Sequence, residues 1–159
     1  MIKKIYPILI ILILTSCGYT PIYNSPNKSD YKINIIEKSG NKLINNLIIS
    51  EIKGISNPQS NTIFNLKINT VFEKIIVSKD VKGTVSDYQL ILRSNFVITK
   101  GDTKETISFV EKQNIKNTSD IFEQKNYENT IKRNFVTSLV RKLNLELLTK
   151  KWFLKRMKL

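Results

Sequence analysis

The 159-residue chain contains no histidine, one cysteine and only five glycines. Without histidine it lacks the most frequent general base of enzymes and the most frequent zinc ligand. One cysteine cannot form an internal disulfide, and glycines at positions 18, 40, 54, 83 and 101 are too scattered for a phosphate-binding loop. These absences favour a binding or scaffolding protein with no metal and no cofactor over an enzyme.

Carboxylates are the remaining route to acid–base catalysis. Glu73, Asp80, Asp87 and Glu111 are candidates for a catalytic pair, but each also fits an ordinary charge at a strand end or in a loop. No spacing of serine and lysine indicates a Ser–Lys dyad. An enzyme acting on lipid or cell wall is therefore the weakest of the functional hypotheses.

Acidic residues are scarce relative to basic ones. The chain has 26 lysines and arginines against 13 aspartates and glutamates, and its formal net charge is +13. Such a charge favours an anionic partner, which is nucleic acid, an acidic membrane surface or an acidic ligand. A genome that favours lysine, isoleucine and asparagine codons produces the same excess, so the total charge does not by itself establish binding.

The one cysteine, Cys17, stands at the end of a secretory signal pattern. Lys3 and Lys4 precede an apolar run over residues 5–14, and Leu14-Thr15-Ser16-Cys17-Gly18 follows. The run is about half the length of roughly 20 residues that a helix needs to span a bilayer. The pattern predicts a leader over residues 1–16. The alternative is a leader that stays attached and a cysteine that remains a free or buried thiol.

Leu14-Thr15-Ser16-Cys17-Gly18 also resembles the lipobox of bacterial lipoproteins. That resemblance implies that Cys17 is acylated and becomes the first residue of the mature protein. Residues 17–29, with two prolines and several Asn and Ser residues, are then an extended tether. A secreted, lipid-anchored protein rarely meets nucleic acid, so anionic lipid or glycolipid becomes the favoured partner.

The first half of the chain after the tether predicts a strand and a helix. Apolar residues alternate with polar ones at Tyr31, Ile33 and Ile35, which is typical of a half-buried strand. Three- and four-residue steps then predict a helix over about 41–53 with Gly54 as its C-terminal cap. Its apolar stripe consists of Leu43, Leu47, Ile48 and Ile52.

Three further strands follow before the pattern becomes helical again. Their predicted inward residues are Phe64, Leu66, Ile68, Thr70 and Phe72, then Tyr88, Leu90, Leu92, Phe96 and Ile98, then Ile107 and Phe109 within 106–111. Gly101-Asp102 is a candidate hairpin turn between the last two strands. From Asp120, a four-residue step predicts a long helix to about Leu148. Its predicted stripe consists of Tyr127, Ile131, Phe135, Leu139, Leu143 and Leu147, broadened by Phe122, Val136 and Val140.

Local signals support the start of that second helix. Asp120 and Glu123 fit a capping box, and Glu128 precedes Lys132 at a favourable spacing for an ion pair. With four one-sided strands and two one-sided helices, residues 30–149 predict a single α+β domain of order β-α-β-β-β-α. Both helices pack on one face of a mixed or antiparallel four-stranded sheet, in a two-layer sandwich. The polar residues of the other face are Lys67, Asn69, Gln89, Arg93 and Asn95.

Two basic clusters are candidate binding sites. Lys74, Lys79 and Lys82 gather around the 78–84 loop at one end of the sheet, with Arg93 placed provisionally on the same side. They either meet phosphate groups of a glycolipid or belong to a solvated loop of a lysine-rich protein. The basic tail, residues 150–159, carries Trp152 and Phe153 and either lies on an anionic surface or extends past the domain.

The run Cys17-Gly18-Tyr19-Thr20-Pro21-Ile22-Tyr23 resembles the mature start of the lipopolysaccharide-assembly lipoproteins, the LptE family, in its alphaproteobacterial branch. The order of elements is similar as well. The resemblance implies an outer-membrane lipoprotein on the periplasmic side, anchored in the membrane by its lipid and seated as a plug in the LptD β-barrel. It further implies contact with lipopolysaccharide, which the protein helps to deliver to the outer leaflet.

One position departs from the family pattern, because Asp87 stands where relatives carry a basic residue before the third strand. A role in ligand contact is therefore not transferred to this position. The alternative to an LptE-like function is a periplasm-facing envelope lipoprotein that binds peptidoglycan or another envelope protein.

Overall fold

The computed structural model describes residues 29–156, and its side chains as far as Thr149. The predicted leader, Cys17 and the tether up to residue 28 lie outside this range, as do residues 157–159 of the basic tail and the side chains of Trp152 and Phe153. The elements run in the order β1 (Lys32–Gly40), α2 (Lys42–Ile55), β2 (Ile63–Lys79), β3 (Val85–Lys100), β4 (Thr103–Lys116) and α3 (Ile121–Arg156).

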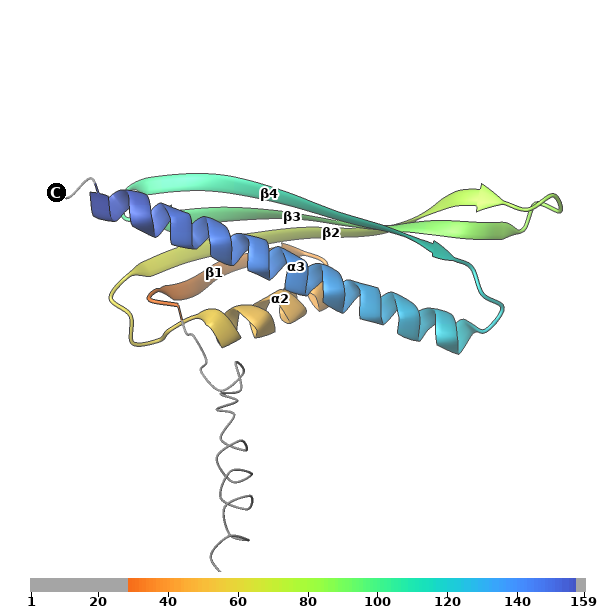
Figure 1. The fold of residues 1–159 in the computed structure, drawn as a ribbon, viewed down its shortest axis with the longest axis horizontal. Coiled ribbons are helices and arrows are strands. Elements are labelled where there is room, and N and C mark those ends of the chain that lie inside the picture. The colour runs from red at the N-terminus through yellow and green to blue at the C-terminus, as the bar shows by residue number, and fades with distance from the viewer. Residues whose placement is uncertain (1–28, 157–159) are drawn as a thin grey trace, which may run out of the picture.

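The four strands form one mixed sheet in the order β1-β2-β3-β4. β1 and β2 are parallel and are joined through α2, whereas β2, β3 and β4 are joined by two antiparallel hairpins. Both helices lie on the same face of the sheet, and the other face is left uncovered (Figure 1). The predicted two-layer α+β sandwich with element order β-α-β-β-β-α is confirmed.

The strand alternation predicts the core well. Tyr31, Phe64, Leu66, Leu90, Leu92 and Phe96 are all at most 2% exposed, and Phe72, Ile107 and Phe109 pack partly buried against them. The predicted turn at Gly101-Asp102 joins β3 to β4 directly, since Lys100 pairs with Thr103. Gly101 has φ +54°, a backbone conformation that glycine adopts without strain.

The first helix starts where predicted but differs from its prediction in one stripe residue and at its C-terminal end. Leu43 is 53% exposed, and the buried stripe is Ile44, Ile48 and Ile52. The N-cap is Asn41, whose side chain accepts a hydrogen bond from the amide of Ile44 at 3.1 Å. The predicted cap at Gly54 is wrong. The helix continues to Ile55, and the amide of Ser56 closes it by donating to the carbonyl of Ile52 at 2.9 Å.

The long helix begins where the sequence predicts. The Asp120 carboxylate accepts hydrogen bonds from the amides of Phe122 and Glu123, at 2.8 and 3.0 Å. The helix is longer than predicted and continues to Arg156. Phe122 and Tyr127, 74% and 47% exposed, do not join its buried stripe.

The buried apolar stripe of α3 starts at Ile131, one turn after Tyr127. Its members are Ile131, Phe135, Val136, Leu139, Val140, Leu143 and Leu147. No helix within residues 29–156 is long and apolar enough to cross a membrane.

A buried polar network joins β1, α2 and β2. The side chain of Asn45, 3% exposed, donates to the carbonyl of Ser39 at 2.8 Å and accepts from the hydroxyl of Thr70 at 2.9 Å. The amide of Asn41 donates to the carbonyl of Thr70 at 2.9 Å. Gly40 makes this approach possible, because its φ is +85° and a Cβ there would overlap the Thr70 carbonyl. The network fixes the edge strand β1 relative to the helix layer.

Candidate binding surfaces

The β2–β3 hairpin carries the lysines that the sequence singled out. Its outer part, residues 74–90, is called the hairpin end below; it extends toward the N-terminus of α3 (Figure 1). Lys74 lies on the helix-covered face, where its Nζ is 2.6 Å from Oε1 of Glu128 and 3.9 Å from the ring centre of Tyr88. The predicted pair of Glu128 with Lys132 is therefore replaced by a contact between helix and sheet.

Arg93 does not join the cluster in which the sequence placed it. Its neighbour Leu92 is buried in the core, so Arg93 points to the uncovered face of the sheet, where it forms an ion pair with Glu73. Lys74 and Arg93 thus lie on opposite faces of the sheet. The alternation of side chains along each strand predicts these directions. Lys74 pairs with the buried Leu90 and points toward the helices, whereas Arg93 pairs with the exposed Val71 and points to the uncovered face.

Lys79 and Lys82 remain together at the tip of the hairpin. Both are exposed, and no described residue between 29 and 149 forms an ion pair with either. The tip has a defined conformation, since a carboxylate oxygen of Asp80 accepts from the amides of Lys82 and Thr84 at 2.9 and 2.8 Å. Two ammonium groups are therefore available to an anion on an ordered turn.

Two carboxylates have lowered pKa values: Asp87 within the hairpin end, and Glu128 of α3, which contacts Lys74 of the hairpin end. Hydrogen bonds from the hydroxyls of Ser78 and Ser86 hold the pKa of Asp87 below its usual value, and the charge of Lys116 acts in the same direction. Partial burial raises the pKa of Glu128. Hydrogen bonds from Lys74 and Gln124, together with the charges of Lys74 and Lys132, lower it by more, so the net shift is downward.

Both carboxylates are thus ionised at neutral pH. The carboxylate of Asp87 is held within the hairpin by the hydroxyls of Ser78 and Ser86.

The uncovered face of the sheet mixes apolar and charged groups. Val71, Arg93 and Val110 lie in one row across β2, β3 and β4, and the two valines are 44% and 48% exposed. Ile75 is 43% exposed, while Ile91 is only 4% exposed although it points to the same face. Glu73 and Lys112 flank Ile91 in the register and account for its burial through their long side chains. Such a preformed face suits a protein partner.

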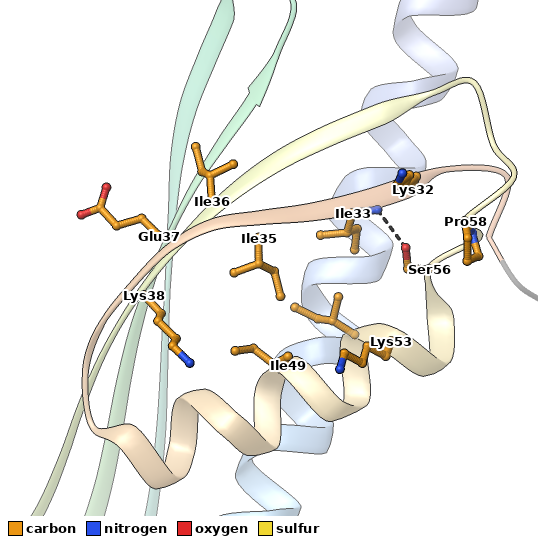
Figure 2. Close-up of a pocket in the computed structure, with 11 residues that line it drawn as sticks. Lys32, Ile33, Ile35, Ile36, Glu37, Lys38, Ile49, Lys53, Ser56 and Pro58 are labelled. Carbon is orange, nitrogen blue, oxygen red and sulfur yellow. Dashed lines mark hydrogen bonds between the residues drawn. The ribbon is translucent and has the colours of Figure 1, made fainter.

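A groove of about 610 Å³ lies at the β1 edge of the sheet, between β1 and α2. Its walls are the isoleucines that face each other across the two layers, Ile33 and Ile35 from β1 and Ile49 and Ile52 from α2 (Figure 2). Lys38 and Lys53 extend along the opening from the two elements, whereas Ile36 and Glu37 point away from it. No pattern in the sequence indicates this groove, because the spacing of residues does not show that β1 is an edge strand.

The residues described between 29 and 156 contain no group of three or more potential metal ligands among His, Cys, Asp and Glu. The surfaces described above provide exposed ammonium groups on an ordered turn at the hairpin tip, and isoleucine walls bordered by lysines at the groove.

No protein-family model and no curated protein sequence matches the chain. Solved structures match its fold. Rare lipoprotein B from Shewanella oneidensis superposes with a TM-score of 0.58 at 12% identity, over 77% of this chain and 99% of that one. A minor lipoprotein from Acinetobacter baumannii gives 0.54 at 11% identity, over 76% of this chain and 93% of that one. A lipoprotein from Caulobacter crescentus gives 0.50 at 8% identity, over 78% and 91%. The chain thus has the fold of these bacterial lipoproteins.

Proposed function

We propose that this chain is an outer-membrane lipoprotein of the LptE kind. It is acylated on Cys17, faces the periplasm, assembles as a plug with an LptD-like β-barrel, and binds lipopolysaccharide for insertion into the outer leaflet. The observation that carries the proposal is the fold shared with rare lipoprotein B along nearly the whole length of that protein. The lipobox-like segment ending at Cys17-Gly18 supports it independently.

The uncovered sheet face is the surface we assign to the barrel wall. It is rigid because its three long strands are paired along their lengths, and it presents Val71, Ile75 and Val110 between charged groups. Such a mixed, rigid face suits a partner that is already folded when the lipoprotein binds it. No enzymatic step is included in the proposal, because plugging and lipid binding need only surface complementarity.

The tip lysines, Lys79 and Lys82, are the residues we assign to phosphate groups of lipopolysaccharide. Charge-assisted contacts of ammonium with phosphate are among the stronger polar interactions. Lys74 and Arg93 are held by Glu128 and Glu73, so a ligand at either must first displace a carboxylate. We therefore expect Lys79 and Lys82 to contribute more to lipopolysaccharide affinity than Lys74 and Arg93.

Co-purification tests the barrel partnership. Extraction of membranes with mild detergent and affinity capture of the tagged full chain should yield a one-to-one complex with a large β-barrel from the outer membrane. The double variant Val71→Asp/Val110→Asp should lose the barrel, because it places two carboxylates on the face assigned to the interface. A matched control, Leu43→Asp/Leu145→Asp, changes two exposed leucines of the helix layer and should retain it.

The alternative, a general envelope lipoprotein, predicts other outcomes. A protein that sediments with cell wall and brings no barrel would assign it to peptidoglycan, and retention in the inner membrane would contradict the proposed location. Lipopolysaccharide binding is tested with Lys79→Ser/Lys82→Ser, expected to weaken affinity, against Lys104→Ser/Lys112→Ser, which removes the same charge from β4. Equal affinity of the two variants would remove the tip from the binding site.

A further inference from the structure

The groove between β1 and α2 combines apolar walls with positively charged residues at its border. Its walls are the isoleucines of both layers, and two of them, Ile35 and Ile49, stay only partly buried. Three ammonium groups, those of Lys32, Lys38 and Lys53, border it, and none has an ion-pair partner among residues 29–149. A binding site for an amphiphile needs apolar walls for the hydrocarbon and unpaired charge of one sign for the head group, and this groove has both.

The one carboxylate at the groove does not neutralise these charges. Glu37 points away from the opening and is 2.5 Å from Nζ of Lys67 on the neighbouring strand β2 (Figure 2). The groove therefore has a net positive border with no counter-ion of its own. Its volume of about 610 Å³ is within the roughly 300–1,000 Å³ typical of small-molecule sites.

The edge of β1 is poorly suited to an added peptide strand, which is the other occupant that such a groove could take. The amide of Lys32 donates toward β2, so the next amide, that of Ile33, points to the free edge, where the hydroxyl of Ser56 already accepts it at 2.9 Å. A register shift between Ile35 and Glu37 interrupts the strand two residues later. Bulges and lysines on an edge discourage strand pairing.

We propose that this groove binds a single acyl chain that carries an anionic head group. The hydrocarbon lies between Ile33 and Ile35 of β1 and Ile49 and Ile52 of α2, and the head group is held by the ammonium groups of Lys38 and Lys53. A carboxylate and a phosphate monoester share the required chemistry. The site lies between the β1 edge of the sheet and α2, on the helix-covered side, whereas the surface assigned to the barrel is the uncovered face, and the site needs no barrel to form.

Photolabelling of the full chain in phosphatidylcholine nanodiscs tests the site. The probes are diazirine-bearing palmitic acid and diazirine-bearing lysophosphatidic acid, with diazirine-bearing lysophosphatidylcholine as the probe without net charge. The anionic probes should label peptides containing residues 33–38 and 49–53. Preferential labelling by one of the two anionic probes identifies the head group as carboxylate or phosphate.

Two variants test the roles of charge and of hydrocarbon. Lys38→Ser/Lys53→Ser should lower labelling by the anionic probes about tenfold, from the loss of two ammonium contacts. The control Lys42→Ser/Lys104→Ser removes the same charge from exposed positions and should label normally. Ile49→Asn places an amide in the wall and should lower labelling by all probes, whereas the circular dichroism of each variant reports that it remains folded.

Three results would overturn the proposal. Equal labelling by the zwitterionic and anionic probes would show that the lysines select nothing. Labelling confined to the uncovered sheet face would place the lipid elsewhere. Protection of residues 33–38 from exchange by an acidic extended peptide, without lipid labelling, would assign the groove to a peptide. Loss of barrel capture with normal lipid labelling would refute the function proposed above and leave this site standing.

Discussion

Gly40 offers the sharpest test of how the edge strand is held. Its φ of +85° is a conformation that costs a residue with a Cβ about 1–2 kcal/mol. A Cβ there would also overlap the carbonyl oxygen of Thr70, and it would lie 2.9 Å from the carbonyl carbon. Since these are backbone atoms of a central strand, β1 and the start of α2 must shift in the variant Gly40→Ala.

The energetic consequence can be worked from the contacts that the shift breaks. The amide of Asn41 loses its hydrogen bond to Thr70, a contribution of about 0.5–1.5 kcal/mol. The cap from Asn41 to the amide of Ile44 is displaced as well, at about 0.5–2 kcal/mol. Together with the backbone strain, we expect Gly40→Ala to lower the free energy of unfolding by about 2–5.5 kcal/mol.

Gly83 supplies a matched control. Its φ of +84° equals that of Gly40 within a degree, but a Cβ there meets nothing within 4 Å. Gly83→Ala should therefore lower the free energy of unfolding by about 1–2 kcal/mol, from the backbone strain alone. For a domain of this size, a kilocalorie per mole corresponds to about 4 °C in Tm.

Urea unfolding and thermal unfolding followed by far-ultraviolet circular dichroism measure the two variants. We expect Tm to fall by about 8–22 °C in Gly40→Ala and by about 4–8 °C in Gly83→Ala. Equal losses in the two variants would refute the reasoning, because they would show that the approach of Thr70 to Gly40 contributes nothing.

Three further predictions concern the core and the contact between sheet and helix. Ile48→Ala, at a position with 0% exposure, should cost about 2–4 kcal/mol, whereas Leu43→Ala, 53% exposed, should cost less than about 0.5 kcal/mol in urea unfolding; equal costs would contradict the buried stripe of α2. Ser94→Ala should raise the free energy of unfolding by about 1 kcal/mol, since its hydroxyl is the one buried side-chain polar atom of the described residues without a partner; a loss of stability would point to an unseen partner. The folded pKa of Glu128 lies below the unfolded value, so its contribution is present above about pH 4.3 and is lost as pH falls through the folded pKa. Glu128→Gln should therefore lower stability at pH 7 and flatten its decline between pH 5 and pH 3, and an unchanged pH profile would remove Glu128 from the linkage.

The proposals on function depend on different parts of the molecule. The barrel partnership depends on the uncovered sheet face and on the fold shared with the lipoproteins of Shewanella oneidensis and Acinetobacter baumannii. Lipopolysaccharide contact depends on Lys79 and Lys82 at the hairpin tip, and the acyl-chain site depends on the groove at the other edge. Variants at one surface leave the others intact, so each proposal can fail alone.

The hairpin end shows where prediction from the sequence stopped. The position of Lys79 and Lys82 beside one turn follows from their proximity in the chain, and the sequence predicted it. The sequence did not predict that Glu128 binds Lys74, because 54 residues separate them and only the packing of α3 on the sheet brings them together. Local spacing favoured Lys132 as the partner of Glu128, but Glu128 forms its ion pair with Lys74.

The sequence by itself determined the layers of this protein. Alternation of apolar residues defined the strands and their inward faces, and three- and four-residue steps defined the helices, because these periods follow from backbone geometry alone. The tertiary structure decided the rest: that β1 is an edge strand, that a groove opens beside it, and that Glu128 pairs with Lys74. These features depend on which elements become neighbours, and contacts between distant segments leave no periodic trace in the chain.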